Sequence, residues 1–237
     1  MTSNNELTRK VVLVTGPAGN LGTAVVNRFL KEPVSLILID RHPDRIEERY
    51  PDLVDSDDHM LITNVDLTNA EIVQNALRSA LDTFGRIDCL IHTAGGFQMG
   101  EKVHQITPEK WDHMMNINVK TLLNITKFTI PAMIDQKKGI IITIGARPSL
   151  KGRKDLGSYS AAKAAVLRLT ESMAAEGRST GIKARCIIPG TIDTPENRQA
   201  MPNADTSKWV RPESIADIIF KICYDENLNE KDVIIRL

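Results

Sequence analysis

Hydrophobic residues in this chain gather in short runs that alternate with longer segments of helical periodicity. Short β-branched runs bounded by turn residues are typical of buried strands, and apolar residues three or four positions apart are typical of amphipathic helices. The runs predict strands at 11–14, 34–39, 61–65, 87–91, 139–144, 182–188 and 233–235. Helical patterns cover 21–30, 68–84, 107–136 with room for a break, a segment that opens at 158–163, and 211–224.

Strands that alternate with helices indicate right-handed crossovers and a parallel sheet. We therefore predict an α/β fold: a Rossmann-type doubly wound parallel sheet in three layers (αβα), forming a single domain over residues 1–237. Residues 1–9 are a polar N-terminal extension. Residues 191–208 are polar, contain prolines and show no clear period, which predicts a substrate lid.

The charge balance narrows the classes of partner. The 237 residues include 30 basic and 30 acidic side chains, which argues against nucleic acid or an anionic membrane as the main partner. The N-terminus lacks the apolar core of a signal peptide, and no apolar run is long enough to span a bilayer. Cys89, Cys186 and Cys223 are widely spaced and form no metal-ligand cluster, so we expect a cytoplasmic protein without a metal.

The first predicted strand leads directly into a glycine-rich turn and then a helix, which is the context of a phosphate-binding loop. Gly16 permits the tight turn, Gly19 lets the backbone approach a pyrophosphate, and Gly22 lets the helix pack close to the strand. The alternative is an ordinary strand-to-helix turn that needs positive φ.

Asp40 ends the second predicted strand, where an acid holds the adenosine ribose hydroxyls of NAD and repels the 2′-phosphate of NADP. Arg41 follows at once, and a guanidinium can hold a phosphate. We therefore expect NADH to be preferred and NADP to be admissible. Asp40 has an alternative role as a cap or turn residue before Pro43. His92, at the end of the fourth strand, is expected to be a hydrogen-bonded structural residue rather than a general base.

Tyr159 and Lys163 lie four residues apart, on one face of the predicted helix. A free phenol titrates near pH 10, and a neighbouring ammonium lowers that pKa, which would allow proton transfer near neutral pH. A pair with this spacing is, by itself, more often a half-buried ring and a solvated charge. The loop before the helix is basic and is expected to be solvated; its cations are Arg147, Lys151, Arg153 and Lys154.

Over essentially its whole length the chain resembles the short-chain dehydrogenase/reductase family. The matching residues are Thr15, Gly16, Gly22, Asp40, Asp66, Ala94, Gly95, Asn118, Tyr159, Lys163, Pro189, Gly190 and Thr194. The resemblance implies Tyr159 as proton donor, Lys163 as the residue that lowers its pKa and binds the nicotinamide ribose, and Asn118 as holder of a relay water. It implies that a bound NAD(P) contacts Gly16, Gly19, Asn20, Leu21, Asp40, Arg41, Asp66, Leu67, Ala94, Gly95, Tyr159, Lys163, Pro189, Gly190, Ile192 and Thr194.

Two positions depart from the family pattern. Asn20 stands where the family has its middle glycine, and Gly19 lies one place earlier. Ala146 stands thirteen residues before Tyr159, where the family usually has a serine. The hydroxyl that stabilises a substrate oxygen by a few kcal/mol is therefore missing. Ser149 replaces it only if the loop folds back.

One branch, quinonoid dihydropteridine reductase, is similar in having glycine at position 19, alanine at 146 and a related lid segment over 191–209. Its reaction leaves no alkoxide to stabilise, so a missing serine costs less. The alternatives are a carbonyl or quinone reductase that tolerates Ala146, and a non-catalytic dinucleotide-binding sensor. The resemblance also implies a homodimer or homotetramer through the helices that carry Asn118 and Tyr159. Apolar residues there are compatible with an interface or with the core: Leu122, Leu123, Val166 and Leu169.

Overall fold

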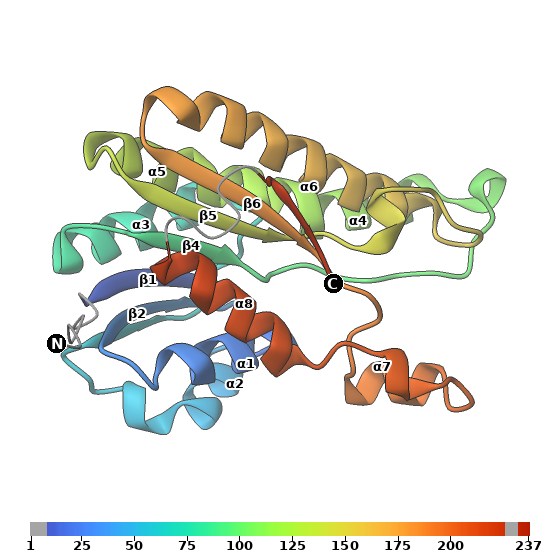
Figure 1. Cartoon of the computed structure of the whole chain (residues 1–237), viewed down its shortest axis with the longest axis horizontal. Coiled ribbons are helices and arrows are strands. Elements are labelled where there is room, and N and C mark those ends of the chain that lie inside the picture. Colours follow the sequence, from blue (N-terminus) through green and yellow to red (C-terminus); the bar gives the residue numbers. More distant parts are fainter. Residues whose placement is uncertain (1–8, 226–231) are drawn as a thin grey trace, which may run out of the picture.

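Seven parallel strands form one sheet in the order β3-β2-β1-β4-β5-β6-β7 in the computed structural model, which describes residues 9–225 and 232–237 (Figure 1). The strands are β1 Lys10–Thr15, β2 Val34–Ile39, β3 His59–Ile62, β4 Cys89–His92, β5 Gly139–Ile144, β6 Ile182–Ile188 and β7 Ile234–Arg236. The α-helices are α1 Asn20–Phe29, α2 Pro43–Arg49, α3 Ala70–Phe84, α4 Pro108–Met115, α5 Thr121–Asp135, α6 Gly157–Glu176, α7 Pro195–Ala200 and α8 Pro212–Tyr224.

The sheet is apolar on both faces because neighbouring residues of each strand point to opposite sides. Val12 and Val14 of β1 pack with α1, α2 and α8, whereas Val11 and Leu13 pack with α3, α5 and α6. Figure 1 shows these two helix layers on either side of the sheet. The predicted fold class, a doubly wound sheet in three layers, is confirmed.

The strand order places a crevice at the carboxyl ends of the sheet. The chain proceeds outward from β1 to β2 and β3 and then returns to place β4 on the other side of β1. The connections that follow β1 and β4 therefore diverge, and ligands of open α/β sheets bind at such a switch point.

The predicted third strand, 61–65, is displaced. The pairing of β3 with β2 runs from His59 to Ile62 and then stops. Asn64 adopts a positive φ of 58°, which turns the chain, and the buried Val65 bonds to the Asp40 carbonyl instead of continuing the ladder. Val65 thus gives the apolar signal of a strand without belonging to one.

The break allowed for in 107–136 is a π-helical turn, Asn116–Lys120, between α4 and α5. The region 191–208, predicted without regular structure, contains the short helix α7 and a 3₁₀ turn at Thr206–Lys208. Helix α7 projects beyond the sheet (Figure 1). Residues 1–8 of the predicted N-terminal extension lie outside the described residues. Within the described part, no helix has the length and apolarity needed to cross a bilayer.

The apolar residues considered for a subunit interface divide between core and surface. Leu122 and Val166 are buried in the core between sheet and helices, and Leu169 is half-buried against it. Leu123 is 47% exposed. The homodimer or homotetramer therefore stays a prediction, with Leu123 as the member of the set that solvent reaches.

Candidate active site

The glycine-rich turn between β1 and α1 depends on missing side chains. Gly16 has φ +68°, and a Cβ there would lie 3.0 Å from the backbone of Ala94. A Cβ on Gly22 would lie 2.1 Å from the Gly16 carbonyl oxygen, whereas one on Gly19 would meet only that oxygen, at 3.4 Å. Gly16 and Gly22 thus serve close packing, and Gly19 leaves an open backbone surface at the start of α1. This arrangement fits a dinucleotide pyrophosphate.

Two side-chain hydroxyl groups hold this turn in place through hydrogen bonds to one of its carbonyl groups. The Tyr50 and Thr23 hydroxyls donate to the Pro17 carbonyl at 2.8 and 3.2 Å. Tyr50 is buried and follows α2, more than thirty residues along the chain, so no local sequence pattern indicated its role.

The residues predicted to hold the adenosine end meet at the ends of β2 and β3. Asp40 accepts a hydrogen bond from the His42 amide at 3.0 Å, so it is a turn residue. The carbonyl of Ile39, directly before it, accepts from the Gly16 amide at 3.1 Å, so Asp40 follows a contact with the glycine-rich turn. The Arg41 guanidinium lies 3.3 Å from Asp66, which also accepts two bonds from Thr68. Arg41 is 66% exposed, and pairs of this kind contribute little.

Tyr159 and Lys163 occupy the first two turns of α6. Lys163 is 9% exposed, and its Nζ donates to the Ile144 carbonyl at 3.0 Å, at the end of β5. The Tyr159 ring packs edge-on against the exposed ring of Phe97, with centroids 4.9 Å apart. Among residues 9–225 and 232–237, no group bonds to the Tyr159 hydroxyl, which is not fully enclosed. The hydroxyl is therefore available to a ligand. Phe97 was not singled out from the sequence, although an aromatic directly after Gly95 and Gly96 was a usable signal.

Burial shifts both titrating groups, and one shift opposes the expectation. Burial raises the pKa of Tyr159 to about 12, so the prediction that Lys163 lowers this pKa is wrong for the structure described here. Burial also lowers the pKa of Lys163 to about 8. At neutral pH the pair is a protonated phenol beside an ammonium group, which is the state needed to donate a proton.

These pKa values predict a descending pH profile for reduction. Below pH 8 Lys163 is an ammonium, and Tyr159 stays protonated throughout, so kcat/KM is expected to be flat from about pH 6 to 7.5. Above about pH 8 Lys163 loses its proton, and kcat/KM should fall about tenfold for each further unit. Steady-state kinetics across this range test the profile. A kcat/KM that rises between pH 8 and 9.5 would indicate that the phenolate is the working form.

Asn118 links the π-helical turn to the end of β4. It is buried, its amide donates to the Gly96 and Met114 carbonyls at 3.1 Å, and it accepts from the Gly96 amide at 3.2 Å. A Cβ on Gly95 would lie 2.8 Å from the Asn118 oxygen and 3.4 Å from the Lys163 nitrogen. Asn118, Gly95 and Lys163 are therefore neighbours, as the sequence predicted for one site. The relay water stays a prediction.

His92 is a structural residue, as expected. It is buried, its Nδ1 lies 2.9 Å from the Thr15 hydroxyl, and its Nε2 lies 3.4 Å from the Thr121 hydroxyl. Burial lowers its pKa to about 3, so the ring is neutral in the folded protein at neutral pH. These bonds join β1, β4 and the start of α5 beneath the crevice.

The depressed pKa of His92 predicts an acid-sensitive fold. An unfolded histidine titrates near 6.5, so between about pH 6.5 and 3 the unfolded chain binds more protons, and the free energy of unfolding falls as pH falls. From pH 6.5 to 4.5 the expected loss is roughly 2 to 3 kcal/mol at 1.36 kcal/mol per pKa unit. Urea unfolding of the wild type and His92→Gln at several pH values measures it. Equal slopes in the two proteins would show that other groups cause the acid sensitivity.

The segment after β6 contains a helix that the sequence signalled but that we did not predict. Thr194 caps α7 by accepting from the Asn197 amide at 3.2 Å, in the same Thr-Pro-Glu pattern that begins α4 at Thr107. The Asn20 amide donates to Glu196 at 2.8 Å, so α7 contacts the glycine-rich turn. Ile192, beyond Pro189 and Gly190, forms an isolated bridge with Val210. The segment therefore lies against the predicted pyrophosphate site.

The position of the missing serine remains without a hydroxyl. Ala146 is extended at the end of β5, and a Cβ on its neighbour Gly145 would lie 2.9 Å from the Cys186 sulfur. The Ser149 Oγ is enclosed and has no hydrogen-bond partner within the described residues. Ser149 therefore does not present its hydroxyl to the crevice, and the proposed substitution for the serine is not supported.

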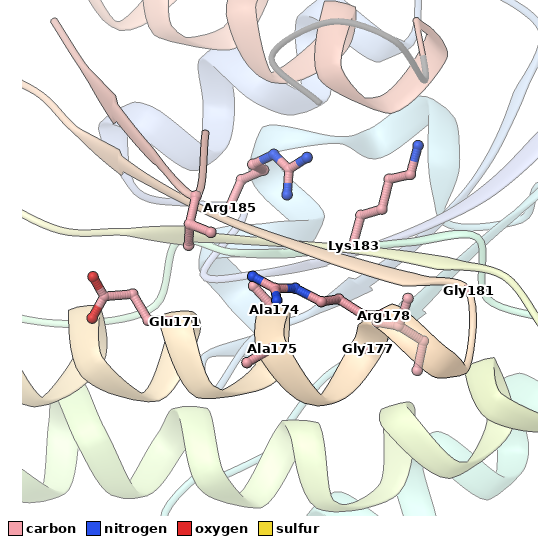
Figure 2. Close-up of a pocket in the computed structure, with 10 residues that line it drawn as sticks. Glu171, Ala174, Ala175, Gly177, Arg178, Gly181, Lys183 and Arg185 are labelled. Carbon is pink, nitrogen blue, oxygen red and sulfur yellow. The ribbon is translucent and has the colours of Figure 1, made fainter. Parts of the chain in front are cut away.

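A separate cavity of about 510 Å³ lies between α6 and β6 (Figure 2). Its polar lining includes Glu171, Arg178, Lys183 and Arg185. Glu171 lies in the later part of α6, Arg178 in the 3₁₀ turn Gly177–Ser179 that follows it, and Lys183 and Arg185 in β6. Tyr159 and Gly190 lie at the opposite ends of α6 and β6. The cavity is therefore distinct from the crevice at the carboxyl ends of the strands.

The structure thus brings the predicted glycines, Asp40, Asn118, Tyr159, Lys163 and the segment from Pro189 to Thr194 to one edge of the sheet. The sequence model described as short chain dehydrogenase matches residues 10–205. The chain belongs to the short-chain dehydrogenase family. The family match and the similarity to curated oxidoreductases both support an oxidoreductase.

An uncharacterized oxidoreductase of Staphylococcus aureus (strain USA300) is 29% identical to this short-chain dehydrogenase over 231 residues, covering 97% of this chain and 98% of the relative. The solved structure of ElxO with NADP bound superposes with TM-score 0.86 at 24% identity, covering 96% of each chain. NAD⁺-bound xylitol dehydrogenase superposes with TM-score 0.86 at 22% identity, covering 96% of this chain and 97% of that one. At these identities the two structures support the fold.

Proposed function

We propose that this short-chain dehydrogenase is an NAD(P)H-dependent reductase in which Tyr159 donates the proton. The observation that carries the proposal is the available Tyr159 hydroxyl, one helical turn from the buried Lys163 ammonium, which itself neighbours Gly95 and Asn118. A bound dihydronicotinamide would supply the hydride. The chain's own residues then position the acceptor, exclude water and deliver one proton from the phenol.

We propose NADH as the preferred dinucleotide, with NADPH admissible. The Asp40 carboxylate, directly after the strand that contacts the glycine-rich turn, favours ribose hydroxyls over a 2′-phosphate. Arg41 and Arg45 lie nearby, since the Arg45 guanidinium is 3.5 Å from the Ala18 carbonyl of that turn. These two cations could bind the 2′-phosphate of NADPH. One solved neighbour holds NADP and another NAD⁺, so the fold accommodates either.

Quinonoid dihydropteridine is the acceptor that we propose first. Ala146 removes the hydroxyl that would stabilise an alkoxide, and reduction of a conjugated imine system forms none. The exposed Phe97 ring beside Tyr159 offers an apolar surface to a flat ring. A steady-state assay with quinonoid dihydrobiopterin and NADH tests the acceptor. Turnover equal to the uncatalysed background would refute this acceptor while leaving the reductase proposal standing.

The second candidate is a carbonyl or quinone reductase that works without the serine. Its support is the neighbour named a xylitol dehydrogenase, whose name denotes alcohol and carbonyl chemistry. Ala146→Ser should then raise ketone turnover, and an unchanged rate would count against it. A non-catalytic sensor is the less favoured alternative, because the accessible phenol and buried amine are both present.

We also propose that residues 191–208 act as a lid over the crevice. The bond between Asn20 and Glu196 holds the lid helix α7 against the glycine-rich turn, and the Asp193–Arg198 pair, at 2.8 Å, stiffens it.

A further inference from the structure

Arg147 differs from the other cations of its loop in one contact. All four cations, Arg147, Lys151, Arg153 and Lys154, are exposed, as the sequence predicted for a solvated loop. The Arg147 guanidinium also lies against Gly190, where a Cβ would approach one of its Nη atoms to 3.1 Å. The side chain thus crosses from the loop after β5 to the turn after β6.

This contact places the guanidinium at the edge where the reaction is proposed to occur. Gly190 belongs to the turn that leads to the lid. A Cβ on Gly190 would also lie 3.5 Å from the side chain of Val210, which pairs with the lid residue Ile192. Arg147 directly follows Ala146, the position of the missing serine. A cation therefore lies beside the place where a hydroxyl is absent.

The charge of Arg147 has no acidic counterpart in the part of the chain that the structure describes: its guanidinium enters no ion pair or hydrogen bond there. The same holds for Lys151 and Arg153 within the described residues, whereas Arg198 pairs with Asp193 at 2.8 Å and Lys154 lies 4.0 Å from Asp155. Of the unpaired cations in this loop, Arg147 is the one that contacts Gly190. A guanidinium keeps its charge at all working pH values and offers five donors in a fixed plane. It is suited to bind an oxygen that carries, or acquires, negative charge.

We propose that Arg147 recognises the acceptor by donating hydrogen bonds to an oxygen conjugated with its reducible centre. The acceptor class is a flat quinonoid or conjugated carbonyl compound. This inference rests on the proposed function. The hydride carries two electrons to the acceptor, and the dinucleotide is oxidised. The proton comes from the Tyr159 hydroxyl. Arg147 gives up no proton and stabilises the oxygen toward which the electron pair shifts.

Turnover of Arg147→Gln, Arg147→Lys and the matched control Lys151→Gln tests the proposal. With quinonoid dihydrobiopterin or menadione as acceptor, Arg147→Gln should lower kcat/KM at least tenfold, and Arg147→Lys should recover part of the loss. Lys151→Gln should match the wild type, because its charge lies in the same loop without the contact to Gly190. The NADH dissociation constant, followed by fluorescence, should be the same in all four proteins. Wild-type kinetics in Arg147→Gln, or an equal loss in Lys151→Gln, would overturn the proposal.

A binding measurement separates this inference from the proposed function. The probe is 2-hydroxy-1,4-naphthoquinone, whose anion is a flat conjugated oxyanion, titrated by calorimetry into protein with and without NAD⁺. The wild type and Lys151→Gln should bind it at least tenfold more tightly than Arg147→Gln. Arg147-dependent binding without turnover of any acceptor would refute the reductase proposal and retain the recognition by Arg147. Absent or unchanged binding in the wild type and Arg147→Gln would refute the recognition.

Discussion

Replacement of Tyr159 by phenylalanine is expected to lower kcat about 10²- to 10⁴-fold, the range that a positioned general acid contributes. The substitution removes a hydroxyl that bonds to no described group, so it should cost the fold little and should leave NADH binding within about twofold. Single-turnover oxidation of NADH, followed at its absorbance maximum with a saturating acceptor, measures the loss.

Tyr224→Phe is the matched control. Tyr224 lies on α8, and its hydroxyl is buried without a partner in the described part of the chain, so the variant removes a phenol hydroxyl away from the crevice. It should keep the wild-type rate. A Tyr159→Phe protein that retains more than a tenth of the wild-type kcat would show that another group supplies the proton.

Replacement of Asp40 by serine is expected to raise the ratio of kcat/KM with NADPH to that with NADH roughly 10- to 100-fold. A carboxylate about 4 Å from a phosphate is repelled by about 1 to 4 kcal/mol, depending on the local dielectric, and each 1.36 kcal/mol corresponds to a factor of ten. Serine removes the repulsion, and Arg41 and Arg45 remain to attract the phosphate.

Asp44→Ser removes an exposed acid in the first turn of α2 and serves as the control for this change of charge. Its cofactor ratio should stay within about twofold of the wild type. An unchanged ratio in Asp40→Ser would place the adenosine ribose elsewhere. An equal rise in both variants would indicate a general electrostatic effect of the lost negative charge rather than a contact between Asp40 and the ribose.

Local sequence patterns predicted much of the fold, because each of these patterns has a physical cause within the same short segment. The run from Val11 to Val14 is buried on both faces, and the glycines that follow it are required by the turn itself. The structural role of His92 followed from its place at a strand end. The third strand was predicted to extend to Val65 because Val65 is apolar, and that residue is buried. The turn at Asn64 ends the β2–β3 pairing before that residue.

Long-range contacts explain what the sequence did not predict. The Thr-Pro-Glu start of α7 was visible, but so short a helix has no period to detect. Burial, rather than the spacing to Lys163, decides the pKa of Tyr159. The contact of Arg147 with Gly190 joins two loops more than forty residues apart and was not predicted, although the basic residues of that loop are exposed as expected.

A crystal structure with NADH would show whether the dinucleotide binds beside Tyr159 and Lys163. We predict a nicotinamide ring at the turn of Pro189 and Gly190, its ribose on Lys163, and the Tyr159 hydroxyl facing the acceptor side of the ring. Density for the dinucleotide outside the crevice, or a nicotinamide ring that Tyr159 does not reach, would contradict this placement.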